Sequence, residues 1–298
     1  SDHTARGATR TRAMTVRRTL PSRERSLIGA WCFLDHYGPD DVASTGGMAV
    51  PRHPHTGLAT VSWLFTGEVD HLDSAGNAAR VLPGELNLMT AGRGITHSEF
   101  STEDTSILHG VQLWFALPDR ARFGDPGFDH YAPETIVVDG GEAVVFLGSL
   151  AGSTSPVQTP TPLLGAELRL RAGSMLTLAV DRGHEHGVLV DTGSATFEGQ
   201  ALNRGDLGYA APGVTSLTVT TGAEDSRLVL IGGEPLGEQI IMWWNFIGRS
   251  HEEITEFRAA YQHEISTGEV GAFGPFPAGT PDPIPAPPLP NARLRLRG

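Results

Sequence analysis

Short apolar runs, rich in Val, Leu, Thr and Phe, are separated by glycine or proline about every eight to twelve residues along the chain. This spacing is typical of an all-β sandwich or barrel, because alternating strands and helices need longer periodic segments. The pattern therefore predicts an all-β protein. The clearest expected strands are residues 60–65, 85–89, 111–115, 142–147, 167–170, 188–191 and 227–231.

Long helical periodicity is scarce, and the exception lies near the C-terminus. Ser250 is a good N-cap residue, and Glu253 follows it at the spacing of a capping box. Four apolar residues then recur at helical spacing: Ile254, Phe257, Tyr261 and Ile265. We expect an amphipathic helix over residues 252–265. Eight of the 21 prolines fall between Pro275 and Pro290, so an extended tail follows, either as a flexible appendage or as a strap across the barrels.

A polar stretch at residues 148–162 divides the chain into two strand-rich halves. We expect a first barrel domain over residues 1–148 with an arginine-rich N-terminal arm, and a second over 149–239. Residues 240–298 then hold the helix and the proline-rich tail. Each half contains a His-x-His pair, His53 with His55 and His184 with His186, which either a duplicated barrel or chance explains.

Composition excludes several classes of function. The single cysteine, Cys32, excludes disulfides within the chain and thiolate metal clusters. All 22 basic residues are arginine, which excludes Schiff-base and P-loop lysines. The net charge of −12 disfavours nucleic-acid binding. No segment approaches the ~20 apolar residues of a membrane span, and the N-terminal arginines precede no signal-peptide core, so we expect a soluble, cytoplasmic protein.

Two residue pairs carry the candidate chemistry. His53 and His55 share one face of an expected strand, since residues i and i+2 of a strand point the same way. His97 and Glu99 repeat this arrangement, with His97 standing 42 residues after His55. Three imidazoles and one carboxylate suit a divalent first-row metal, whereas a closed zinc site more often contains cysteine. The alternative interpretation is exposed or core histidines, which we expect for His3, His71, His109, His130, His251 and His263.

The surrounding residues strengthen the metal interpretation. Gly47 precedes His53 at the spacing of the first cupin motif, and residues 92–97 read Gly-Arg-Gly-Ile-Thr-His, which ends like the second. In these segments the chain resembles the pirin family, a branch of the two-barrel cupins, or bicupins. The resemblance covers most of the chain, with matching segments at residues 33–39, 53–57, 89–99, 232–236 and 243–246.

The resemblance implies two jelly-roll cupin barrels, of which only the first binds metal. In pirins, the residues that match His53, His55, His97 and Glu99 bind iron. It therefore implies one Fe(II) ion, with Ni, Mn, Co, Cu and Zn as alternatives. No Gly-x-x-His follows His186, so we expect no second metal site. The chain departs from many pirins at Ala59, where they have Glu, which puts the contacts around the metal ligands in doubt.

Some pirins resemble quercetin 2,3-dioxygenases, which open a flavonol ring with molecular oxygen and release carbon monoxide. On this hypothesis the substrates are a flavonol-like aromatic molecule and oxygen, Glu99 is the general base, and Trp63 and Met89 line the pocket. Other pirins are regulators without enzymatic activity that bind a partner protein according to the oxidation state of iron. A cupin isomerase is a third alternative. Two barrels in one chain can replace a cupin dimer, so we expect a monomer.

Overall fold

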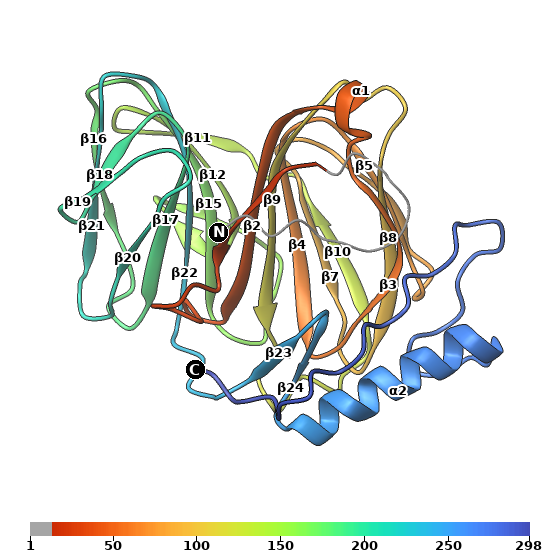
Figure 1. The fold of residues 1–298 in the computed structure, drawn as a ribbon. Coiled ribbons are helices and arrows are strands. Elements are labelled where there is room, and N and C mark those ends of the chain that lie inside the picture. Colours follow the sequence, from red (N-terminus) through yellow and green to blue (C-terminus); the bar gives the residue numbers. More distant parts are fainter. Residues whose placement is uncertain (1–13) are drawn as a thin grey trace.

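The computed structural model describes residues 14–298, which form two β-barrels side by side and one long helix beneath the first barrel (Figure 1). The expected arginine-rich arm lies partly outside the described residues, because Arg6, Arg10 and Arg12 precede residue 14. Each of the seven expected strands lies inside an observed strand, apart from Glu85, which precedes its strand by one residue, and most observed strands are longer than expected. The prediction of an all-β protein with two barrels is confirmed.

The first barrel is built from two antiparallel sheets. The larger sheet has the order β1-β2-β9-β4-β7-β10, and the smaller has the order β3-β8-β5-β6. The strands of the larger sheet are β1 (Val16–Leu20), β2 (Trp31–Asp41), β4 (Leu58–Thr66), β7 (Leu86–Thr90), β9 (Ile107–Ala116) and β10 (Gly127–Tyr131). Those of the smaller are β3 (Ala49–His55), β5 (Val69–Asp73), β6 (Ala78–Val81) and β8 (Ile95–Ser101).

The second barrel repeats this plan, with sheet orders β11-β12-β15-β22-β17-β20 and β16-β21-β18-β19. The larger sheet contains β11 (Thr135–Val138), β12 (Gly141–Leu147), β15 (Leu163–Leu170), β17 (Glu185–Thr192), β20 (Leu207–Ala210) and β22 (Ser226–Gly233). The smaller contains β16 (Met175–Ala179), β18 (Ala195–Phe197), β19 (Gln200–Leu202) and β21 (Ser216–Thr221). Two short hairpins complete the strands: β13 (Ser149–Leu150) with β14 (Ser153–Thr154), and β23 (Ile241–Trp243) with β24 (Phe246–Gly248).

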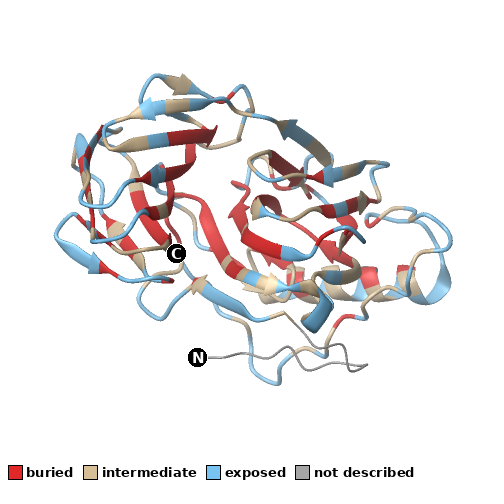
Figure 2. Cartoon of the chain, turned by 90° about the horizontal axis from the view of Figure 1, so that it is seen from above, coloured by how far each residue is buried: buried red, intermediate tan, exposed pale blue. Residues whose placement is uncertain are grey.

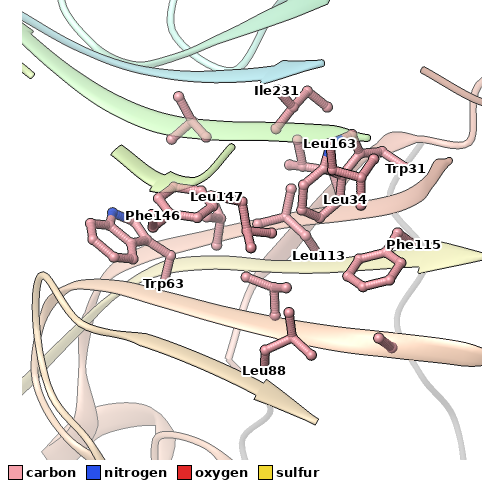
Figure 3. Packing of buried hydrophobic residues seen from close by; sticks show 14 of the residues in the cluster. Trp31, Leu34, Trp63, Leu88, Leu113, Phe115, Phe146, Leu147, Leu163 and Ile231 are labelled. Carbon is pink, nitrogen blue, oxygen red and sulfur yellow. The ribbon is translucent and has the colours of Figure 1, made fainter. Parts of the chain in front are cut away.

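The two larger sheets pack face to face, and their facing side chains form one hydrophobic core between the barrels (Figure 3). Trp63 of β4 stacks on Phe146 of β12, with ring centroids 4.5 Å apart. The indole of Trp31 donates hydrogen bonds to the backbone oxygens of Leu164 and Gly232. Buried segments gather where the barrels meet, and exposed residues lie on the outer rims (Figure 2). This shared core joins the barrels firmly, since burial of apolar surface is the main stabilising term.

The C-terminal segment closes over one side of the first barrel. Helix α2 (His251–Thr267) begins after Ser250, whose side chain accepts a hydrogen bond from the backbone nitrogen of Glu253, as the sequence predicts. Only one further short helix is described, α1 (Val42–Thr45). The proline-rich tail is a strap: Ile284 donates a backbone hydrogen bond to Arg52 of β3, and the Tyr261 hydroxyl donates to the Ile284 oxygen at 2.7 Å. Within residues 14–298 we find no helix with the length and apolarity of a membrane span.

Candidate metal centre

Three neighbouring strands of the smaller sheet, β3, β8 and β5, carry polar pairs at i and i+2. In the strand register, His97 of β8 lies opposite His53 of β3 on one side and opposite Asp73 of β5 on the other. Glu99 lies opposite His71. These side chains are buried, so the sheet collects polar groups inside the first barrel. Such a cluster needs internal partners, because a buried polar group without one costs free energy.

The imidazoles of His53, His55 and His97 converge. The Nε2 atoms of His55 and His97 are 3.1 Å apart, and one nitrogen of each of the three rings lies within 4.8 Å of the others. His53 Nδ1 donates to the Pro51 oxygen at 2.8 Å, and His55 Nδ1 donates to the Asn245 oxygen at 3.2 Å. A neutral imidazole that donates from Nδ1 keeps the lone pair of Nε2 free. The group therefore suits a single metal ion.

Electrostatics favour the neutral form of these rings. Burial lowers the pKa of His53 to about 4, although the hydrogen bond to Pro51 opposes this shift. Burial, together with neighbouring imidazoles, also places the pKa of His55 and of His97 well below the ordinary value. Neutral imidazole is the form that binds metal ions, so the site needs no deprotonation near neutral pH.

Glu99 lies beside the three imidazoles. Its Oε2 atom is 4.0 Å from His97 Nε2. Burial raises the pKa of Glu99, and the proximity of His71 and hydrogen bonds from Ser62 and Gln112 partly offset this shift. A carboxylate that is held by polar neighbours next to three imidazoles can either bind a cation or accept a proton from a ligand.

A cavity of about 400 Å³ lies over the imidazoles and Glu99. Its wall includes Phe33 and Trp114, whose rings stack with centroids 3.9 Å apart and planes 9° from parallel. Met14, Val16 and Met48 add further apolar surface. Tyr37 also lines the cavity, and its hydroxyl is buried and has no hydrogen-bond partner within residues 14–298. The cavity is therefore lined mainly by apolar surface, with the imidazoles, Glu99 and a few other polar groups among it.

Two expected pocket residues lie elsewhere. Trp63 is fully buried between the barrels, where its indole donates to Glu167 at 2.8 Å. It points away from the cavity because it alternates with Ser62, which faces Glu99. Met89 packs against Ala91 and Ile95 in a separate cluster. The expectation that Trp63 and Met89 line the pocket was therefore wrong.

Ala59 lies away from the metal centre, whereas His71 is a core histidine, as expected, that also contacts His97. Ala59 belongs to the hydrophobic core between the barrels, so its short side chain leaves no gap at the metal centre. His71 lies directly behind His97, with their Nδ1 atoms 3.4 Å apart, and bonds to Asp73 at 2.9 Å. The sequence contained a signal for this pair, since His71-x-Asp73 repeats the i and i+2 spacing of His97-x-Glu99.

A second histidine cluster lies between the barrels. His36 and His109 each place Nε2 at 2.6 Å from Oδ1 of Asp191, and Arg227 donates to the other carboxylate oxygen at 3.3 Å. Burial acts to raise the pKa of Asp191, but the two histidines outweigh it and lower the pKa. These short contacts are hydrogen bonds across the barrel interface. His109 is thus a core histidine with a partner, as expected from the sequence.

The family models match both barrels. Residues 12–115 match the model named Pirin, and residues 165–265 match the model of the Pirin C-terminal cupin domain. This chain belongs to the pirin family. The predicted bicupin architecture is therefore confirmed for this pirin, whereas the domain limits at residues 148 and 239 stay a prediction. β11 and β12, which precede residue 148, pair with β15 in the larger sheet of the second barrel.

Relatives and solved structures agree with this membership. A Pseudomonas aeruginosa protein, named provisionally as a quercetin 2,3-dioxygenase, is 41% identical over 288 residues, covering 96% of this pirin and 90% of the relative. The crystal structure of a quercetin 2,3-dioxygenase from Acinetobacter baumannii is 35% identical, with a TM-score of 0.88 over 98% of this chain and 95% of that one. An Escherichia coli pirin crystallised with nickel(II) shares the fold, with 20% identity and a TM-score of 0.59 over 77% of this chain and 96% of that one.

Proposed function

We propose that this pirin is a mononuclear iron protein that acts as a quercetin 2,3-dioxygenase-like oxygenase on flavonol-type substrates. His53, His55, His97 and Glu99 are the proposed metal ligands. The observation that carries the proposal is the cavity of about 400 Å³ directly over these four side chains. A ligand-sized cavity favours a small-molecule substrate over a site that only reports the oxidation state of iron.

The residues present fit a metal ion. The distance of 3.1 Å between His55 Nε2 and His97 Nε2 is about the separation of two ligand atoms that share one first-row ion at ~2.1 Å each. The neutral ring of His55 donates from Nδ1, so its Nε2 carries a lone pair and no proton, and this lone pair is free to bind a metal ion beside His97 Nε2. Iron in this position supplies Lewis acidity and redox chemistry toward oxygen. Nickel, manganese, cobalt, copper and zinc suit the same donor set.

The side chains around the cavity have separate roles. Glu99 accepts the proton of the substrate hydroxyl, because it is the lining carboxylate beside the imidazoles, whereas Asp35, which also lines the cavity, is paired with Arg18. The stacked pair of Phe33 and Trp114 offers a flat apolar wall for an aromatic ring. Met14 and Met48 exclude water from the bound substrate, which strengthens the electrostatic interactions beneath it.

Oxygen uptake with quercetin tests the proposal. The iron-loaded protein is compared with Glu99→Ala loaded to the same iron content. We expect uptake by the wild type and a loss of at least about a hundredfold in the variant, the scale of removing a general base. Absence of uptake by wild-type protein with one bound iron would contradict the oxygenase proposal and favour a redox-sensing regulator that binds a partner protein.

A further inference from the structure

We propose that His71 is a positioning residue that couples the ligand His97 to the buried carboxylate of Asp73. The inference rests on the metal centre proposed above and goes beyond its four ligands. The three side chains are linked in sequence by two contacts, with 3.4 Å between the Nδ1 atoms of His97 and His71 and 2.9 Å between His71 Nε2 and Asp73 Oδ2. All three are buried.

The three imidazole ligands differ in what orients them. His53 and His55 donate from Nδ1 to backbone oxygens, of Pro51 and Asn245. His97 instead faces the ring nitrogen of His71. A backbone carbonyl can only accept, so it fixes the tautomer of a ligand without help. An imidazole nitrogen accepts only when its own proton is on the other nitrogen, so the tautomer of His97 depends on that of His71.

Asp73 sets the tautomer of His71. Because a carboxylate only accepts, the proton of the neutral His71 ring lies on Nε2, toward Asp73, and its Nδ1 is left free to accept from His97. His97 then donates from Nδ1 and turns the Nε2 lone pair toward the proposed metal position. Asp73 is itself fixed, because it accepts from the backbone nitrogens of Ala75 and Asn77 and from the Asn77 side chain.

A carboxylate behind a ligand histidine also changes the donor strength of that ligand. Partial transfer of charge through the hydrogen bonds makes the His97 nitrogen a stronger donor, and such partners typically change metal affinity by about 10–100-fold. A stronger donor stabilises Fe(III) more than Fe(II). His97 is the one proposed imidazole ligand, among the described residues, with a carboxylate in this position.

A purely structural role for His71 predicts something different. Its ring also packs on Phe128, with centroids 4.8 Å apart. If packing alone explains the residue, an apolar side chain of similar size lowers the unfolding free energy at most and leaves the metal properties unchanged. The experiment must therefore measure the metal and the fold separately.

Two substitutions at one position make this separation. His71→Leu removes the acceptor, whereas His71→Asn keeps an acceptor oxygen near the position of Nδ1 but removes the link to Asp73. His109→Leu is the matched control, since His109 is also a buried histidine bonded to a buried aspartate but lies between the barrels. For each variant we measure the affinity for Co(II) and the visible spectrum of the Co(II) protein. The Fe(III)/Fe(II) potential is measured on the iron-loaded protein, and thermal unfolding is measured on the metal-free protein.

We expect His71→Leu to bind Co(II) about 10–100-fold more weakly, with an altered spectrum. His71→Asn should recover most of the affinity, but its Fe(III)/Fe(II) potential should rise by about 59 mV if Fe(III) binding weakens tenfold more than Fe(II) binding. His109→Leu should lower thermal stability and leave both metal properties at wild-type values.

Affinity and spectrum unchanged in His71→Leu, or a loss in His109→Leu as large as that in His71→Leu, would overturn the inference. If His71→Leu does not fold, an unchanged potential in His71→Asn overturns it in the same way. Wild-type protein that binds no Co(II) overturns the metal centre itself. Metal binding without oxygen uptake contradicts only the oxygenase proposal, since none of these measurements depends on turnover.

Discussion

The two barrels share one strand order but fill their interiors differently. In the first barrel, β3 and β8 present His53, His55, His97 and Glu99 to the interior. In the second, the strands at the same places in the smaller sheet are β16 and β21. They present buried apolar side chains to the interior: Leu176, Leu178, Leu217 and Val219.

This difference shows what the fold supplies and what it leaves to single residues. The antiparallel pairing of two strands brings four side chains together at i and i+2, whatever their chemistry. Leucine and valine side chains at these places form the hydrophobic core of the second barrel. Histidines and a carboxylate at the same places need hydrogen-bond partners and leave room for a ligand. One architecture therefore gives a packed core in one half and a cavity in the other.

The second His-x-His pair is not the counterpart of the first. His184 precedes β17 and His186 lies within it, whereas His53 and His55 lie at the end of β3. In the larger sheets, the run β2-β9-β4-β7 of the first barrel corresponds to the run β15-β22-β17-β20 of the second. β17 therefore corresponds to β4 and not to β3. His186 is fully buried, and neither of its ring nitrogens has a hydrogen-bond partner within residues 14–298. The repeated sequence pattern thus arises at different places in the two barrels.

The sharpest test of the comparison is metal content. We expect His97→Ala to weaken metal binding by about a thousandfold or more, which is about 4 kcal/mol, because a ligand and its oriented lone pair are lost. His186→Leu should keep the wild-type metal content of one ion per chain. Elemental analysis after dialysis against the metal measures both. Loss of metal in His186→Leu would show that the second barrel also binds it.

The unfolding free energy should be more sensitive to substitutions inside the second barrel than to substitutions in the cavity of the first. Leu217 is fully buried in the second barrel, so Leu217→Ala should lower the unfolding free energy by roughly 3 kcal/mol through lost transfer energy and a new void. Met48 lines the cavity of the first barrel, and Met48→Ala should cost less than about 1 kcal/mol because no packed core is opened. Urea unfolding of the two variants compares them. Equal losses would indicate that the first barrel is packed as tightly as the second.

Much of the site was predictable because its pattern is local. His53 with His55 and His97 with Glu99 stand at i and i+2, and glycines around them fit two known motifs. The capped helix was predictable for the same reason, since Ser250 and Glu253 are neighbours in sequence. Short-range patterns of this kind need no knowledge of which strands become neighbours.

The rest depends on contacts between distant segments. β4 is buried on both faces, so alternation alone does not show that Trp63 faces the second barrel instead of the cavity. His71 gains its place only when β5 pairs with β8. The proline-rich tail becomes a strap through hydrogen bonds to Arg52 and Tyr261, which the composition of the tail does not reveal.

Acid sensitivity of the second barrel should come from His186. Burial, with His184 nearby, lowers its pKa to about 4, below the value of about 6.5 in an unfolded chain. As pH falls from about 6.5 toward 4, the unfolded chain binds a proton that the folded chain does not, so stability decreases. Between pH 7.5 and 5 we expect wild-type metal-free protein to lose about 2 kcal/mol more than His186→Leu. Parallel losses in urea titrations would contradict this assignment.

The smallest expected effect concerns the Tyr37 hydroxyl. Its removal tests whether the cavity binds a ligand or is only an unfilled part of the core. Tyr37→Phe removes an unpaired buried hydroxyl, so the unfolding free energy should not decrease. Binding of quercetin to metal-loaded protein without oxygen should weaken about fivefold, or about 1 kcal/mol, because one hydrogen bond to the ligand is lost.

Tyr209→Phe is the matched control in the second barrel, where the hydroxyl donates to Glu185 at 2.8 Å. That variant should lose stability and keep wild-type affinity, measured by fluorescence titration. If both variants instead lose stability and neither loses affinity, the Tyr37 hydroxyl stabilises the fold and does not bind the ligand.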